Sequence, residues 1–277
     1  MSSSPPTVSC LLVTADRPRL IQRALRSYQR QTYEALELVV LDNGDEPVKE
    51  IVESFELPGS VRYRYQERTA DLWIGGLRNQ ALELATGEFV VPQWDDDDWS
   101  HPERVERQVA ALQKGYDVCT LQGTLMHVDH PEYFDHPFIG ILPDGVPPTM
   151  MHRRDADIRY PNIRRTSDTD YLNDWREKRH VILPREASYL YLRYSHGGNL
   201  WETDHFLRRM RNTPTDFLRY VWHRYLRRDV FGHPRFQLTE KMEAAFEQYL
   251  DNSFRYDLFE HGPSAADPSS RAETTAE

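Results

Sequence analysis

The sequence predicts a mixed α/β fold in which helices cover a mostly parallel sheet. Over the first hundred residues, short apolar runs alternate with segments of helical spacing, which is the pattern of strands joined by crossover helices. The chain has 277 residues, of which 39% are hydrophobic and 28% are charged, so it can bury one sizeable core. These two observations favour a globular α/β domain and exclude a disordered or fibrous chain.

Strands and helices are predicted in alternation up to residue 91. The first apolar run covers residues 8–13, and a helix follows with Pro18 in its first turn and Asp16 as a candidate cap. Its apolar face repeats at helical spacing through Leu20, Ile21, Ala24, Leu25 and Tyr28. Next come a strand at 37–41, a helix at 48–55, a strand at 61–65, a helix at 74–85 and a strand at 89–91. Gly87 is expected to end the last of these helices in the left-handed conformation.

Beyond residue 100 the strand signals are more widely spaced. Pro102 opens a helix that Gly115 can terminate, whereas residues 126–149 are rich in Pro, His, Asp and Gly and predict a long loop or an irregular hairpin over the site. Strands are expected at 118–121, 181–183 and 189–194, and a helix at 171–175. The last part of the chain shows helical spacing without strand signals, for instance at Met242, Ala245, Phe246, Tyr249 and Leu250.

Composition limits the setting in which this chain works. The N-terminus lacks the basic and apolar regions of a signal peptide, and no stretch reaches the roughly 18 apolar residues of a membrane span, so we expect a cytoplasmic protein. Cys10 and Cys119 lie in apolar runs and suit buried thiols in a reducing compartment. The net charge of -10 argues against a broad surface for non-specific DNA binding.

Four consecutive aspartates, Asp95 to Asp98, follow the predicted strand at 89–91 directly. The carboxyl edge of the sheet is where open α/β folds bind their ligands. Magnesium or manganese that bridges a diphosphate takes only one or two protein carboxylates, and the triplet that starts at Asp95 can supply them. The alternative is a solvated acidic turn that caps the helix at Pro102. Four clustered negative charges disfavour the folded state unless a cation offsets their repulsion.

Several blocks in the right order resemble the family 2 glycosyltransferases, which are inverting enzymes of the GT-A fold. The blocks are residues 8–18 (the opening strand and loop), 31–33 (QTY), 40–45 (VLDNGD, similar to VVDDGS in the family), 77–82 (LRNQAL, similar to ARNxAL), 85–89 (ATGEF, similar to ATGEY) and 94–99 (WDDDDW, similar to LDADDW). Each block is weak alone, but together they cover roughly the first forty per cent of the chain. The resemblance implies a GT-A type, Rossmann-like and mostly parallel sheet flanked by helices, with a C-terminal helical extension.

The resemblance implies a nucleotide-sugar donor, with a UDP-sugar favoured. Asp42 would accept a hydrogen bond from the base, and Arg78 would offer a charge-assisted fork to the diphosphate. The residues expected to bind the donor are Thr14, Asp16, Arg17, Asp42, Asn43, Arg78, Asp95, Asp96 and His196. Helix capping by Asp16 and a solvated position for Arg78 are the alternatives.

A divalent cation, Mn²⁺ or Mg²⁺, is the implied cofactor. Asp97 would ligate it, and Asp95 would meet the ribose or a metal-bound water. His196 lies in a segment that resembles the family's R-x-x-H-x-x-N pattern, Arg193 to Asn199. It would complete the metal shell or hydrogen-bond the diphosphate, whereas a structural histidine is the alternative.

The general base is expected in the block from Thr166 to Leu172, which resembles the acidic pair of the family. Ser167 stands where a glutamate often does, so Asp168 is the expected base and Asp170 could exchange roles with it. A helix cap at Ser167 or Asp168 is the alternative. The resemblance implies a single displacement in which an acceptor hydroxyl attacks the anomeric carbon and the configuration inverts.

The expected domain order follows from these assignments. The transferase domain covers 1–210, with a donor-binding half at 7–122 and an acceptor-side half at 123–210, followed by a helical extension at 211–261 and a disordered tail at 262–277. The C-terminal helices are a candidate surface for homo-oligomer contacts. The acceptor is not identified and could be a glycan, protein, small molecule or nucleic acid.

Two other functions compete with sugar transfer. One is a catalytically inert module that keeps the fold and binds glycans or a partner protein. The other is a sugar nucleotidyltransferase, which would be expected to carry a glycine-rich basic loop after the first strand. Residues 14–18 contain no glycine, so the second alternative is disfavoured.

Overall fold

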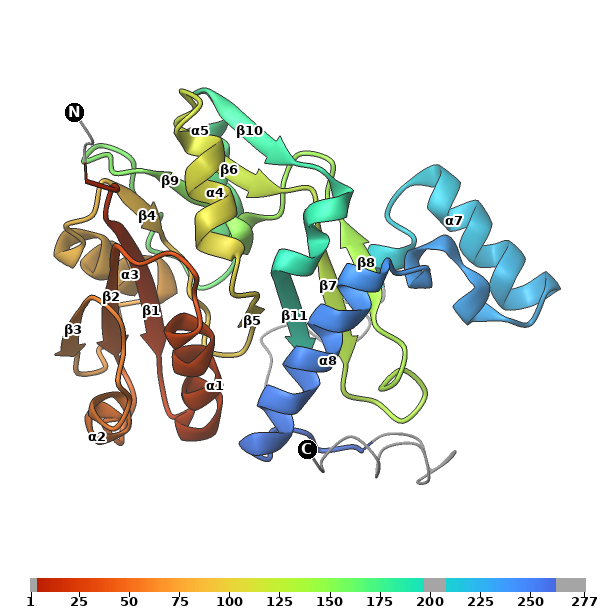
Figure 1. The fold of residues 1–277 in the computed structure, drawn as a ribbon, viewed down its shortest axis with the longest axis horizontal. Coiled ribbons are helices and arrows are strands. Elements are labelled where there is room, and N and C mark those ends of the chain that lie inside the picture. Colours follow the sequence, from red (N-terminus) through yellow and green to blue (C-terminus); the bar gives the residue numbers. More distant parts are fainter. Residues whose placement is uncertain (1–3, 197–207, 263–277) are drawn as a thin grey trace.

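The computed structural model describes residues 4–196 and 208–262 and confirms the predicted α/β class (Figure 1). In this part of the chain, seven strands form the larger sheet in the order β10-β6-β9-β4-β1-β2-β3. Only β9 runs against its neighbours; the others are mutually parallel. The strands are β1 (Val8–Thr14), β2 (Leu36–Asp42), β3 (Ser60–Tyr65), β4 (Phe89–Val91), β6 (Val118–Leu121), β9 (Met151–Arg153) and β10 (His180–Leu183).

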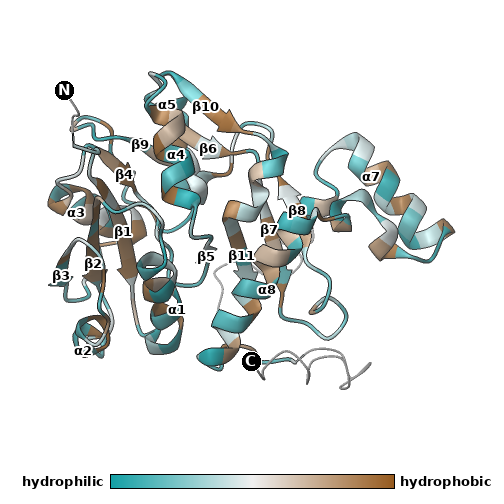
Figure 2. Ribbon diagram, in the orientation of Figure 1, coloured by the Kyte–Doolittle hydropathy of each residue, from teal (hydrophilic) through white to brown (hydrophobic). Residues whose placement is uncertain are grey.

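Helices cover both faces of the larger sheet. Successive residues of a strand point to opposite faces, so Cys10 and Leu12 of β1 belong to one buried cluster and Leu11 to another. Figure 2 shows β1 and β2 as hydrophobic strands between the helices. The first cluster packs on α1 (Pro18–Gln29), α2 (Lys49–Glu53) and α4 (Arg104–Leu112), and the second on α3 (Ile74–Leu84) and α5 (Ser167–Arg176).

A smaller sheet forms the second half of the molecule. Its order is β5-β11-β7-β8 in the described residues, with β5 (Trp99–Ser100), β7 (Gly123–Val128), β8 (Phe138–Ile141) and β11 (Tyr191–Ser195). The antiparallel pair β7 and β8 is the irregular hairpin predicted within residues 126–149, although β7 begins earlier than expected. Because β5 directly follows the acidic run, the four aspartates link the two sheets.

The C-terminal helices differ in how they meet the body. Helix α8 (Glu240–Arg255) packs on the smaller sheet through the residues whose spacing predicted it, Met242, Ala245, Phe246, Tyr249 and Leu250. Helix α7 (Pro214–Val221) and the π-helical turn η4 (Trp222–Leu226) project from the end of the molecule (Figure 1). None of the described helices is both long and apolar enough to cross a membrane. The expected tail beyond Gly262 lies outside the described residues.

Two local predictions are wrong. Gly87 is not in the left-handed conformation, which among the described glycines is adopted by Gly59, Gly115 and Gly145. Position 87 instead suits glycine because the backbone passes close by: a Cβ there would lie 2.7 Å from Ser9 Oγ and 2.7 Å from the backbone oxygen of Thr7, which precedes β1. Asp16 does not cap α1; it has a positive φ of 54° and accepts a hydrogen bond from the backbone of Asp45.

Each sheet is joined to a helix by one buried histidine. In β9, His152 Nδ1 contacts the backbone oxygen of Arg153 at 2.7 Å, and Nε2 meets the Tyr171 hydroxyl of α5 at 3.0 Å. In β7, His127 Nε2 contacts the backbone oxygen of Phe134 at 3.0 Å, and Nδ1 meets the Tyr249 hydroxyl of α8 at 2.8 Å. Burial lowers the pKa of His152 to about 4 and that of His127 to about 3, so both rings are neutral at pH 7.

Candidate active site

The acidic run lies between the two sheets, and a buried tryptophan anchors each of its ends. Trp94 continues the pairing of β4, because its backbone N–H donates to the Leu11 oxygen at 2.8 Å, and its indole N–H donates to the Ala24 oxygen at 3.0 Å. Trp99 begins β5 and is buried in the core of the smaller sheet. The loop between these anchors therefore lies at the carboxyl edge of the larger sheet, where the sequence predicts a ligand site.

The four aspartates alternate in exposure. The side chains of Asp95 and Asp97 are 24% and 20% exposed, whereas those of Asp96 and Asp98 are 4% and 9% exposed. A ligand or cation that enters from solvent can therefore reach the first and third carboxylates directly. The second and fourth are held by the protein.

Asp96 and Asp98 tie the loop to its surroundings. Asp96 accepts hydrogen bonds from Thr14 Oγ1 and Arg17 Nη1, each at 2.7 Å. Burial outweighs the attraction of Arg17 and raises the Asp96 pKa to about 6. Asp98 accepts from the Tyr191 hydroxyl at 2.8 Å and from the Tyr194 backbone at 3.1 Å, both in β11. Burial, reinforced by the charge of Asp97, raises the Asp98 pKa to about 7.

Asp97 is held as a carboxylate anion. Although burial disfavours its charge, His196 and Arg17 outweigh that effect and keep the Asp97 pKa below its usual range. Asp97 Oδ2 lies 3.9 Å from His196 Nε2 and 3.1 Å from Arg17 Nη1. Its backbone oxygen accepts a 2.6 Å hydrogen bond from Arg23 Nη2, a buried arginine that also contacts the Ser253 hydroxyl of α8 at 3.0 Å.

Asp95 faces a basic residue on the neighbouring helix. Arg78 of α3 lies 3.4 Å from Asp95 Oδ1 and stacks over the Tyr160 ring at 5.4 Å. Burial raises the pKa of Asp95, while Arg78 opposes this shift. The guanidinium of Arg78 therefore stands at the wall of the site with one exposed carboxylate beside it.

A cavity of about 440 Å³ opens in front of these carboxylates. Its lining combines the acidic loop with basic and aromatic groups from four other segments. The lining residues include Arg17, Asn43, Trp73, Arg78, Gln93, Asp95, Asp96, Asp97, Asp98, Arg164, Arg165, Asp168 and Arg193. Anionic and cationic groups thus face the same space, as a diphosphate with a cation would require.

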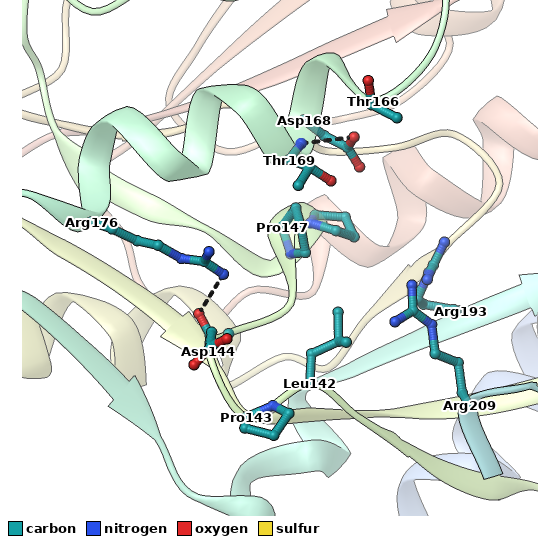
Figure 3. Close-up of a pocket in the computed structure, with 12 residues that line it drawn as sticks. Leu142, Pro143, Asp144, Pro147, Thr166, Asp168, Thr169, Arg176, Arg193 and Arg209 are labelled. Carbon is teal, nitrogen blue, oxygen red and sulfur yellow. Dashed lines mark hydrogen bonds between the residues drawn. The ribbon is translucent and has the colours of Figure 1, made fainter. Parts of the chain in front are cut away.

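A second cavity, of about 360 Å³, adjoins the first. The two share Pro148, Thr166, Asp168 and Arg193 in their linings. Figure 3 shows Asp168 above the prolines of this cavity, with Arg193 and Arg209 side by side on one wall and Arg176 on the other. Asp168 therefore stands at the boundary between two spaces, each large enough for a sugar-sized group.

Several expected site residues lie away from the first cavity. Asp42 is fully buried, and its carboxylate accepts hydrogen bonds from the backbone of Gly44 and Val48 and from the Tyr63 hydroxyl, at 2.9, 2.8 and 2.6 Å. Asp16 is engaged with Asp45 and Arg68.

Three more expected residues stand outside the linings of the two cavities. Asp170 is exposed on α5 and lines neither cavity. Thr14 and His196 lie behind the acidic loop and contact Asp96 and Asp97. Asn199 falls outside the described residues.

The arginines that line the two cavities but were not assigned as site residues from the sequence are Arg164, Arg165, Arg176, Arg193 and Arg209. Arg193 belongs to the R-x-x-H segment and lies 4.0 Å from Asp98, so its place in that pattern was the available signal. Arg209 stands in an arginine-rich stretch, for which the sequence leaves open two interpretations, contact with an anionic acceptor or a solvated face. Arg193 and Arg209 line the same wall of the second cavity, and burial together with the nearby charge of Arg193 lowers the pKa of Arg209.

The exposed carboxylates suit a metal ion that takes part of its ligands from a bound diphosphate, rather than one enclosed by protein ligands alone. Within residues 4–196 and 208–262, no three His, Cys, Asp or Glu side chains are arranged to enclose a metal ion. A magnesium or manganese ion that also binds a diphosphate needs only one or two carboxylates. Asp97, which is ionised and exposed to the cavity, fits that requirement, with Asp95 nearby and His196 behind it.

Comparisons with known proteins bear on this arrangement. The model of the family described as Glycosyl transferase family 2 matches residues 9–232. EpsE of Bacillus subtilis (strain 168), which is named as a glycosyltransferase, is 26% identical over 192 residues, covering 62% of this chain and 66% of EpsE. The chain spans between 30% and 66% of the length of the first curated relatives that it matches.

Two solved structures resemble the fold. The crystal structure of S. aureus TarS 1–349 in complex with UDP-GlcNAc matches with a TM-score of 0.56 and 19% identity, covering 91% of this chain and 84% of that chain. The mannosyltransferase PcManGT from Pyrobaculum calidifontis, in complex with GDP-Man and Mn²⁺, matches with a TM-score of 0.53 and 15% identity, covering 90% and 76%. These likenesses confirm the fold predicted from the sequence.

Proposed function

Because the chain belongs to glycosyl transferase family 2, we propose that it transfers a sugar from a nucleoside-diphosphate donor, favouring a UDP-sugar, to an acceptor hydroxyl with inversion. The position of Asp168 at the boundary of two adjoining cavities carries this proposal. In a displacement the acceptor hydroxyl must lie next to the base that removes its proton and in line with the donor carbon that it attacks, so the base is expected where the donor and acceptor spaces meet. The complexes of TarS with UDP-GlcNAc and of PcManGT with GDP-Man support a nucleotide-sugar donor.

The donor occupies the first cavity. Arg78 and Arg17 supply positive charge toward the diphosphate, and Asn43 and Trp73 line the side nearest the ends of β1 and β2. A divalent cation held by Asp97, with Asp95 and His196 nearby, would neutralise charge on the leaving diphosphate. Thr14 and Asp96 orient Arg17, since all three are linked by hydrogen bonds. Asp16 and Asp42 shape the β1 and β2 turns next to the nucleotide rather than contacting it.

The acceptor occupies the second cavity. Asp168 removes the proton from the acceptor hydroxyl, the oxygen forms a bond with the anomeric carbon, and the bond from that carbon to the diphosphate breaks. The nucleoside diphosphate leaves on the opposite side, so the configuration inverts. Asp170 is exposed and outside both cavities, which supports Asp168 as the base.

The second cavity favours an acceptor with negative charge near its reacting hydroxyl. Arg193 and Arg209 lie together on its wall. Among the described residues, no carboxylate lies within ion-pair distance of Arg209. A phosphate or carboxylate on the acceptor would relieve the repulsion between the two guanidiniums through charge-assisted hydrogen bonds.

The test is a product assay on the full chain with a panel of nucleotide sugars, with and without Mn²⁺ or after chelation. We expect release of nucleoside diphosphate from one donor, dependent on the metal. Release that continues undiminished after complete chelation would contradict the metal-assisted mechanism. Proton NMR of the product reports its anomeric configuration, and retention would contradict the single displacement.

A further inference from the structure

Helix α7 and the turn η4 carry an unusual surface. Five large apolar side chains within ten residues are 50–69% exposed, namely Phe217, Leu218, Trp222, Tyr225 and Leu226. They make up half of the ten exposed large apolar side chains in the described part of the chain. Scattered single apolar residues are normal on a surface, but a contiguous patch marks an interaction site.

The patch forms one face of the helical segment. Positions 217, 218, 222, 225 and 226 fall on one side at helical spacing. The other side is fastened to the body: Asp216 is buried and pairs with Arg235 at 2.6 Å, and the Thr213 hydroxyl caps the helix by accepting from the Asp216 backbone at 3.1 Å. The apolar face is therefore held away from the protein interior, at the end of the molecule (Figure 1).

The segment that carries this face is rich in arginine, although Arg219 pairs with Asp216 at 3.8 Å and Arg224 pairs with Glu132 at 3.1 Å. Residues 208–228 contain seven arginines and a single acidic residue, Asp216, although the whole chain has a net charge of -10. Figure 2 shows hydrophilic and hydrophobic residues side by side along α7. A helix with Trp, Tyr and Leu on one face and arginines around it is typical of segments that lie in the interface of an anionic membrane.

We propose that Pro214–Leu226 and its flanking arginines form a binding surface for anionic lipid headgroups, with the apolar face lying at the acyl boundary. A second copy of the chain is a poorer occupant. A two-fold symmetric contact would place the same face of both copies together, so the arginine-rich borders of both copies would meet. An anionic membrane offers an acyl region for the apolar face and negative headgroups for the arginines.

The location of this surface links it to the second cavity. Helix α7 contacts the turn η3 (Arg208–Met210), which carries Arg209 of the cavity wall. Binding to a membrane would bring this wall close to the lipid surface. Lipid binding itself does not depend on the proposed sugar transfer, so the two can fail separately.

The test is co-sedimentation of the full chain with vesicles of phosphatidylcholine alone or of phosphatidylcholine mixed with phosphatidylglycerol. We expect binding to the mixed vesicles that weakens as salt is added. The double variant Trp222→Ser/Leu226→Ser should bind roughly tenfold more weakly or worse, because its apolar face is reduced. Arg227→Gln/Arg228→Gln should also weaken binding by roughly tenfold, since each basic residue near the surface adds to the attraction.

Matched controls come from β3, at the opposite end of the molecule. Tyr65 is 43% exposed and Arg64 is exposed, so Tyr65→Ser and Arg64→Gln should leave vesicle binding unchanged. Circular dichroism melting identifies any variant that fails to fold, and the two arginine substitutions leave the apolar face untouched. Equal binding by the α7 variants and the β3 controls would overturn the proposal. So would a chain that ignores anionic vesicles but forms a dimer that Trp222→Ser/Leu226→Ser dissociates.

Discussion

The two cavities that meet at Asp168 are built in different ways. The first combines the ends of β1 and β2 and the loop that follows β4 with the start of α3 and residues 164–168, so its four aspartates are placed by the edge of the larger sheet. The second is made from the connection after β8, the start of α5 and the turn η3, which are far apart in the chain. Connections of this kind vary more readily than sheet edges. We therefore expect the proposed donor site to follow the shared fold and the proposed acceptor site to be particular to this chain.

Removing the exposed carboxylate of the first cavity should have the largest effect. Asp97→Asn should lower kcat/KM by roughly a thousandfold or more, because a cation that neutralises the leaving diphosphate contributes several kcal/mol. Mn²⁺ should also no longer enhance the thermal stabilisation of the protein by UDP. Melting curves with UDP, with and without Mn²⁺, check this directly. A variant whose UDP stabilisation still rises with Mn²⁺ would place the metal elsewhere.

Substitution of Asp168, on the wall that the two cavities share, should lower the rate of transfer without weakening donor binding. Asp168→Asn should lower kcat by roughly a hundredfold to ten-thousandfold, since general-base catalysis contributes on that scale. UDP affinity, measured by calorimetry, should be unchanged because Asp168 lies at the boundary of the two cavities and is not among the residues proposed to hold the diphosphate or the cation. Asp170→Asn is the matched control, because it changes a carboxylate two residues away that lines neither cavity. If the Asp170 variant lost as much kcat as the Asp168 variant, the assignment of the base would be reversed.

The buried strands β1, β2, β4 and β6 of the larger sheet were predictable because they are apolar on both faces, whereas the short strand β9 (Met151–Arg153) was not predicted. The strand predicted at 8–13 is β1 (Val8–Thr14), and that predicted at 118–121 is β6 with the same bounds. Strand β7 (Gly123–Val128) was not predicted at its start because it contains Thr124 and His127, which are polar. His127 is buried only because Tyr249, 122 residues later, supplies its hydrogen bond. A hydrogen-bond partner that far along the chain leaves no pattern in the sequence around His127.

The place of the acidic run was predictable, but the orientation of its side chains was not. A run that follows a buried strand must lie at the sheet edge. The burial of Asp98, however, depends on hydrogen bonds from Tyr191 and Tyr194 in β11. Asp42 was expected at the nucleobase, and its carboxylate accepts hydrogen bonds from the backbone of Gly44 and Val48 and from the Tyr63 hydroxyl of β3, contacts that the sequence pattern does not reveal. Arg209 looked like any arginine of a basic segment, because only the fold brings it beside Arg193.

The effect of pH on the two buried histidines can show whether the larger and the smaller sheet unfold together. A histidine in the unfolded chain binds a proton below a pKa of about 6.5, but folded His152 and His127 do so only near about 4 and about 3. The unfolded state therefore binds more protons as pH falls, and the unfolding free energy decreases. Between pH 7 and pH 5 each histidine should account for about 2 kcal/mol of this loss.

Replacing either histidine should remove its share of the acid sensitivity. Urea unfolding of His152→Gln and His127→Gln at pH 7 and pH 5 should show a smaller loss than the unsubstituted chain. If both substitutions act on one transition, the sheets form one cooperative unit. Two transitions, each altered by only one substitution, would instead make the sheets independent. Acid sensitivity that neither substitution changes would show that the rings are not neutral in the folded state.

The smallest expected effect concerns the wall of the second cavity alone. Arg209→Gln should raise KM for an anionic acceptor about tenfold, because a hydrogen bond to a charged group contributes roughly 1.5–3 kcal/mol. It should leave donor KM and the slow hydrolysis of the donor by water unchanged, since neither reaction uses that wall. Arg64→Gln on β3 is the control for the loss of a surface charge. Neutral acceptors should be used equally well by the variant and the unsubstituted chain. A rise in donor KM would instead show that Arg209 reaches across the shared boundary, and the two cavities would then act as one site.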